Sequence, residues 1–242
     1  GTVLGTADNP PTVEVPGSML LWRALLQWLG GIGIVLIFVA LLPAGAANKH
    51  LMTAEAVGVA NDGYQPRVLQ QARWVVAVYV VLTACIAALM TVGSMEWLDA
   101  TCHAFSALAT GGYSTRTSVA NFHDLPAEIV LTVFMYLGGC SFTVLAGVLR
   151  DGRTGLRSML TGGEFRLYTL VTVLGVLVTT LDLVRAGKGL GTSLREASFN
   201  VVSMLSCCGF AISDFQAWPP LSLLVIFACT MMGGCSGSAA GG

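Results

Sequence analysis

The chain has 242 residues, of which 55% are hydrophobic and only 10% are charged, and its mean hydropathy is +0.76. Soluble domains carry about 25% charged residues, so this composition excludes a disordered chain and almost any soluble enzyme. The net charge of −1 offers no surface for a polyanion, and no nucleic-acid partner is expected. We therefore expect an all-α, polytopic membrane protein whose solvent is the lipid bilayer.

Long apolar stretches predict the order of the membrane-spanning helices. A helix needs about 20 apolar residues to cross a bilayer. Stretches of this kind, the last of them cut short, lie at 18–42, 73–93, 126–149, 166–184 and 219 to about 236. The sequence therefore predicts five spans.

Two further stretches, 97–109 and 194–208, have helical periodicity but are too short to cross a membrane. Such lengths are typical of helices that enter the bilayer and return. A glycine turn follows each of them, at Gly111-Gly112 and at Gly209.

The positions of Lys and Arg predict which loops face the cytoplasm. Seven of the twelve basic residues lie within 43–73 and 150–166, which are therefore expected inside: Lys49, Arg67, Arg73, Arg150, Arg153, Arg157 and Arg166. Nine of the thirteen acids lie in segments expected outside: Asp8, Glu14, Glu96, Asp99, Asp124, Glu128, Asp182, Glu196 and Asp214. An acidic outer face would concentrate cations.

The glycines indicate an internal repeat of spanning helix, short helix, glycine turn, polar linker and a second spanning helix with a Gly-Gly pair. The pairs are Gly30-Gly31, Gly138-Gly139 and Gly233-Gly234. We expect Gly1 to be the remnant of an earlier glycine turn, and both ends to be cuts. The expected organisation is the end of repeat 1 (1–43), an inner loop (44–72), repeat 2 (73–149), an inner loop (150–165) and a truncated repeat 3 (166–242).

The physics of this unit indicates a pore. Irregular backbone at membrane depth is tolerated only where protein buries it or where it lines a wet cavity. A short helix that ends in glycine places bare carbonyls there, together with the negative end of the helix dipole. Rings of such carbonyls replace the hydration shell of a monovalent cation.

Five motifs carry a family resemblance. They are LLWRALLQWLGGIGIVLIFVALLP (20–43), ATGGYSTR (109–116), YLGGCSF (136–142), CCGFAISDF (207–215) and MMGGCSGSAAGG (231–242). In this order they resemble the membrane subunit of the Trk/Ktr/HKT superfamily of potassium transporters, and in particular its bacterial Trk type. The resemblance implies four pore-loop repeats around one cation path, of which the fourth would be absent here.

The resemblance also implies a selectivity filter lined by main-chain oxygens. Its residues would be Gly1 in repeat 1, Ala109, Thr110, Gly111 and Gly112 in repeat 2, and Cys207, Cys208 and Gly209 in repeat 3. Gly111 and Gly209, 98 residues apart, would be the equivalent glycines. Potassium would bind the backbone carbonyls of Thr110, Gly111, Cys208 and Gly209. The two cysteines depart from the family's usual threonines, which leaves the carbonyls in place but removes hydroxyls that brace the loop.

The last ten residues predict a break in the final span, because runs of Gly, Ser, Ala and Cys have poor helix propensity. In the resembled family this stretch is an intramembrane loop that acts as the gate. The implied gate loop consists of Gly233, Gly234, Cys235, Ser236, Gly237, Ser238, Ala239, Ala240, Gly241 and Gly242. For Gly30-Gly31 and Gly138-Gly139, close helix packing is the expected role.

Taken together, the resemblance implies potassium uptake across the bacterial inner membrane, with potassium as substrate and no bound cofactor. It further implies a homodimer in membrane lipid and a cytoplasmic nucleotide-binding regulatory subunit. The alternatives are a sodium-permeable member of the same superfamily and a sodium- or proton-coupled transporter of another solute. No HExxH, GxSxG or Cys/His metal array is present in the sequence, so no enzyme activity is expected.

Several single residues have open alternatives. Arg23 either snorkels outward or pairs with an acid such as Glu14. His103 either packs in the core or relays protons, and Asp214 either braces its turn, attracts cations or is a solvated acid. Asp182 and Arg185 are expected at the membrane interface. The cysteines are expected to pack in apolar surroundings, and adjacent Cys207 and Cys208 are not expected to bind a metal, because their side chains diverge.

Overall fold

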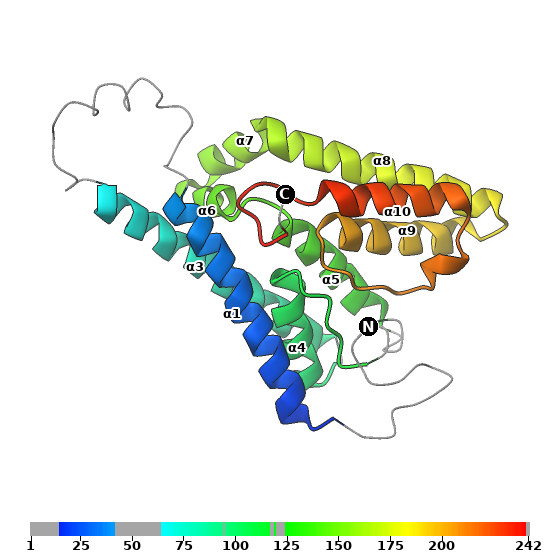
Figure 1. Cartoon of the computed structure of the whole chain (residues 1–242), viewed down its shortest axis with the longest axis horizontal. Coiled ribbons are helices and arrows are strands. Elements are labelled where there is room, and N and C mark those ends of the chain that lie inside the picture. The colour runs from blue at the N-terminus through cyan, green and yellow to red at the C-terminus, as the bar shows by residue number, and fades with distance from the viewer. Residues whose placement is uncertain (1–14, 42–63, 94, 117–118, 120–123, 241–242) are drawn as a thin grey trace.

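The computed structural model describes residues 15–41, 64–93, 95–116, 119 and 124–240, and this part of the chain is helical apart from its turns and loops (Figure 1). Its helices are α1 (Gly17–Leu41), α3 (Tyr64–Val92), α4 (Trp97–Leu108), α5 (Leu125–Gly138), α6 (Phe142–Asp151), α7 (Arg153–Thr161), α8 (Gly163–Arg185), α9 (Leu190–Leu205), the short 3-10 helix η4 (Phe215–Ala217) and α10 (Pro220–Met232).

Three of the described helices, α1, α3 and α8, are long and apolar enough to cross a membrane on their own. The α5–α6 pair qualifies only when it is counted as one bent span, and α10 is a shorter apolar helix of 13 residues. The short helices α4 and α9 form where expected, with 12 and 16 residues. The helical membrane fold that the composition predicts is therefore confirmed.

The described helices form two similar three-helix groups. In one group α3, α4 and α5 pack together, and α1 lies against α3 and α4; in the other, α8, α9 and α10 lie side by side (Figure 1). In both groups the short helix packs against the two longer ones. α4 and α9 thus have the same place in their groups.

The stretch 126–149 is not the single straight span that we expected. It breaks after Gly138, and the axes of α5 and α6 differ by 99°. Side chains are excluded at the break, because a Cβ at Gly139 would overlap the Tyr168 ring. The last residues of the chain complete the hydrogen bonding there: Cys235 N donates to Gly139 O at 2.8 Å, and Phe142 N donates to Gly237 O at 3.1 Å. Gly138-Gly139 is thus both a packing site, as predicted, and a break.

The expected inner loop 150–165 also contains the helix α7, which the apolar count did not predict. Its Gly155 lies against the backbone of Gly147 in α6, where any side chain would overlap the Gly147 carbonyl. This close approach holds α7 against α6 directly before the start of α8.

One buried ion pair joins the two groups of helices. Arg195 of α9 donates from Nε and Nη2 to the two carboxylate oxygens of Glu128 in α5, both at 2.6 Å. The Glu128 side chain is 3% exposed and that of Arg195 is 46% exposed. A bidentate pair fixes orientation as well as distance, so it sets how α9 docks on α5.

We predict that Arg195→Met lowers the melting temperature of the purified protein by several degrees. The substitution leaves the Glu128 carboxylate buried without its cation, at a cost of about 2 kcal/mol, less than for a fully buried pair because Arg195 is partly exposed. The double variant Glu128→Gln/Arg195→Met should recover part of the loss. The exposed pair of Arg150 and Asp151 is the control, and an Asp151→Asn variant as unstable as Arg195→Met would contradict the prediction.

Candidate functional site

The two short helices end in turns of the same backbone shape. Thr110 after α4 and Cys207 after α9 have φ of 51° and 55°, and they are the two non-glycine residues with positive φ in the described part of the chain. A second positive φ follows two residues later, +66° at Gly112 and +87° at Gly209. These angles favour glycine because they crowd a Cβ.

The hydrogen bonds of the two turns match as well. Gly111 N donates to Ser106 O at 2.7 Å, and Cys208 N donates to Ser203 O at 2.8 Å. The Ser106 hydroxyl accepts from Tyr113 N, while the Ser203 hydroxyl donates to Phe210 O, both at 2.7 Å. These bonds fix each turn to the last helical turn before it.

This geometry corrects the register that we expected between the repeats. The structural equivalents are 97 residues apart, so that Thr110 matches Cys207, Gly111 matches Cys208, and Gly112 matches Gly209. The sequence analysis had instead paired Gly111 with Gly209, because it matched the first glycine of the Gly111-Gly112 pair. One signal in the sequence gives the correct register: an aromatic residue directly follows the equivalent glycine in each turn, as in Gly112-Tyr113 and Gly209-Phe210.

The two turns touch each other. A Cβ at Gly112 would overlap the carbonyl oxygen of Cys208, so only glycine permits this approach. The Cys208 thiol is buried and lies 3.9 Å from Ser106 O at the end of α4. By contrast, a Cβ at Gly209 would meet open space.

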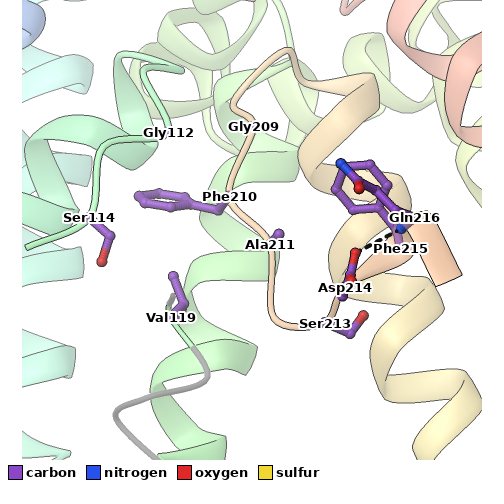
Figure 2. A pocket seen from close by; sticks show the side chains of 10 residues that line it. All are labelled: Gly112, Ser114, Val119, Gly209, Phe210, Ala211, Ser213, Asp214, Phe215 and Gln216. Carbon is purple, nitrogen blue, oxygen red and sulfur yellow. Dashed lines mark hydrogen bonds between the residues drawn. The ribbon is translucent and has the colours of Figure 1, made fainter. Parts of the chain in front are cut away.

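A cavity of about 290 Å³ borders both turns (Figure 2). Gly112 and Gly209 contribute to its wall, together with Ser114, Val119 and residues 210–211 and 213–216 of the segment that follows Gly209. Asp214 lines it as an exposed carboxylate, and its Oδ1 accepts a hydrogen bond from Gln216 N at 3.0 Å. Asp214 therefore both braces the turn before η4 and faces the cavity, which combines two of its expected roles.

The chain after α10 forms an irregular loop, as the poor helix propensity of these residues predicts. The helix ends at Met232, and Gly233 has φ of 71°. The loop reaches the first turn, where the Thr110 hydroxyl donates to Ala239 O at 2.9 Å. Gly1, Gly241 and Gly242, which we expected in the filter and the gate loop, lie outside the described residues.

Glu164 in the first turn of α8 also holds this loop, which the sequence analysis did not predict. Its Oε1 accepts hydrogen bonds from both the backbone N and the hydroxyl of Ser236, the latter at 2.7 Å. The available signal was that Glu164 is one of the few acids on the side expected to be basic. The loop is thereby tied to the junction of α7 and α8.

The other single residues have definite places. The Arg23 guanidinium lies over the Tyr113 ring at 4.9 Å and donates to Ser114 O at 3.1 Å, whereas Glu14 lies outside the described residues. Asp182 near the end of α8 accepts from the N and the hydroxyl of Ser222, at the start of α10. Free cysteines are buried at Cys102, Cys140, Cys208, Cys229 and Cys235, and exposed at Cys85 and Cys207.

We predict that Gly112→Ala is far more damaging than Gly111→Ala. A methyl group at Gly112 meets a backbone carbonyl and a positive φ, so the two turns must separate. At Gly111 it meets only the Gln27 side chain, which can move. The check is the amount of folded protein in the membrane and its melting temperature. Equal losses for the two variants would contradict the contact between the turns.

Comparison with known proteins agrees with this architecture. A family model described as "TrkH: Cation transport protein" matches residues 2–242. The Trk system potassium uptake protein TrkH of Halomonas elongata is 33% identical over 232 residues, which are 94% of this chain and 48% of that protein. TrkG of Escherichia coli K12 is 30% identical over all of this chain and 50% of its own length.

A crystal structure of the potassium transporter TrkH from Vibrio parahaemolyticus superposes with a TM-score of 0.81 at 29% identity. The match covers 95% of this chain and 47% of the TrkH chain, so this chain spans about half the length of the relatives it matches. The spanning helices, the paired turns and the match along nearly the whole sequence lead to one conclusion: the chain belongs to the TrkH family of cation transport proteins.

Proposed function

We propose that the protein containing this chain takes up potassium across the bacterial inner membrane through a pore lined by the two turns. The observation that carries the proposal is the contact between equivalent turns, each at the end of a short helix. The negative ends of α4 and α9 both point toward this contact and favour a cation there. The cavity bordered by Gly112 and Gly209 would give water and ions access to the turns.

In this proposal the backbone carbonyls of Ala109, Thr110, Gly111 and Gly112 in one turn, and of Cys207, Cys208 and Gly209 in the other, replace the water around K⁺. Carbonyls serve this purpose whatever the side chain, so the cysteines at 207 and 208 are compatible with it. The exposed carboxylate of Asp214 would raise the local concentration of cations at the outer mouth.

The loop Gly233–Ala240 is proposed as the gate. Its contact with Thr110 places it against one filter turn, and its contact with Glu164 connects it to the inner helices α7 and α8. A loop held at both places is suited to obstruct the pore and to move with the inner face. Gly241 and Gly242 would complete it.

The relatives are named as parts of a Trk system. By analogy we propose that the complete protein forms a homodimer in the membrane and binds a cytoplasmic nucleotide-binding regulatory subunit. Helix α7 favours docking of that subunit on the inner face, because it carries the positive charges of Arg153 and Arg157. It directly precedes α8, whose Glu164 holds the proposed gate loop.

The test of the proposed function is potassium uptake in bacteria that lack their own uptake systems. Expression of the complete gene should restore growth at low external potassium and produce saturable ⁸⁶Rb⁺ influx, and the Gly112→Ala variant should not. Influx of sodium with no preference for potassium would favour the sodium-permeable alternative. A protein present in the membrane that moves neither ion would refute the proposal.

The gate is tested by loosening the loop. Glu164→Ala removes the acceptor for Ser236, and deletion of residues 236–239 shortens the loop. Both should raise cation flux and reduce its dependence on the regulatory subunit. Glu164→Gln retains an acceptor oxygen and should resemble wild type. Arg166→Ala on the same helix turn should do so too, since the Arg166 side chain donates to Leu160 O of α7. If the variants fold and still need the regulatory subunit for full flux, the loop is only an interruption of the helix and not a gate.

A further inference from the structure

Each short helix carries a large buried polar side chain seven residues before the first residue with positive φ in its turn. These are His103 in α4 and Asn200 in α9, which are 97 residues apart and therefore equivalent in the corrected register. Both are fully buried, with 0% exposure. Burying a polar group is costly unless it is hydrogen-bonded. Both ring nitrogens of His103 and the amide nitrogen of Asn200 have partners, whereas Asn200 Oδ1 is buried without one.

Both side chains connect their own helix to the segment that leaves the turn. His103 Nδ1 lies 2.7 Å from Asp99 O, and its Nε2 lies 2.9 Å from the Ser114 hydroxyl. Asn200 Nδ2 donates to Glu196 O at 2.8 Å and to the Ser213 hydroxyl at 3.1 Å. In both repeats the bridge runs from a carbonyl four residues earlier in the helix to a serine beyond the turn.

The chemistry of the partners assigns the hydrogens in the neutral ring. A carbonyl only accepts, so Nδ1 of His103 carries the hydrogen and Nε2 accepts from the Ser114 hydroxyl. The Ser114 oxygen in turn accepts from Arg116 N at 3.1 Å. The segment after the first turn is therefore held by a chain of bonds that ends on the helix backbone.

His103 also reaches the other repeat. Its ring stacks on Phe210 at a centroid distance of 5.6 Å, and Phe210 directly follows Gly209. Ser114 and Phe210 both line the cavity at the turns (Figure 2). One imidazole thus contacts the segments that leave both turns.

We propose that His103 and Asn200 are positioning residues, which hold the segments outside the two turns and thereby set how strongly the pore prefers potassium to sodium. The inference rests on the proposed pore. A carbonyl ring discriminates between ions of similar charge through its size and stiffness. The hydrogen bonds of His103 and Asn200 affect the stiffness of the carbonyl ring, although neither side chain contacts the ion.

The decisive experiment measures uptake by the complete protein in cells that lack other potassium uptake. His103→Leu keeps the bulk of the side chain but removes both hydrogen bonds. It should lower the preference for potassium, taken as the ratio of KM for sodium to KM for potassium, by about tenfold. The maximal rate should change much less. His103→Gln can still bond to Ser114 and should restore most of the preference.

Ser114→Ala removes only the partner hydroxyl and should reproduce the loss. The double variant His103→Leu/Ser114→Ala should be no worse than either single variant, because both break the same bond. Thr101→Val is the matched control on α4, since the exposed Thr101 hydroxyl donates to Trp97 O of its own helix. Asn200→Leu and Ser213→Ala test the equivalent brace.

An unchanged ratio in His103→Leu, or a loss of maximal rate alone, would overturn the inference and leave His103 as a packing residue. If His103→Leu does not accumulate in the membrane, Ser114→Ala decides by the same ratio. Failure of wild type to take up potassium would instead refute the proposed function. In that case the hydrogen bond between His103 and Ser114 is tested by measuring how much K⁺ and Na⁺ each raise the melting temperature of the purified wild type and of the Ser114→Ala variant. Equal shifts in both proteins would overturn the inference.

Discussion

The rule that backbone groups at membrane depth must be hydrogen-bonded governs this structure more than any other constraint. Two short helices end inside the protein, one span breaks after Gly138, and the last span stops at Met232, so several segments of backbone lack helical partners. They satisfy one another. The broken span and the final loop exchange bonds through Gly139 O and Cys235 N, and through Phe142 N and Gly237 O.

This mutual dependence explains why the glycines gather where they do. Gly139 and Gly112 lie where a side chain would overlap a ring or a carbonyl from another part of the chain. The resulting close contacts join the two groups of helices, and the Glu128–Arg195 pair adds a fixed orientation at the other end of the α5–α9 contact. The proposed pore would need such cross-links, because it would lie between the repeats and not within one of them.

The two turns and the loop after α10 form one connected unit. Thr110 is bonded to Ala239, and Ser236 is bonded to Glu164 at the start of α8. A displacement of α7 and α8 can therefore reach the turn through a few hydrogen bonds. On the other side of the turns, His103 and Asn200 hold the outgoing segments to rigid helices. The turns are thus held on one side by the loop after α10 and on the other by the short helices.

The sequence by itself determined the membrane class, most of the helical stretches, the two short helices and the irregular backbone from Gly233 on, because apolar length and helix propensity are local properties. It did not determine the register between the repeats, the sharp break after Gly138 or the partners of His103, Glu164 and Arg195. These depend on which backbone groups meet across the fold, and one residue of offset between two glycines is invisible until Gly112 is seen against the Cys208 carbonyl. Only the tertiary structure decided them, because a contact between distant segments is a property of their packing.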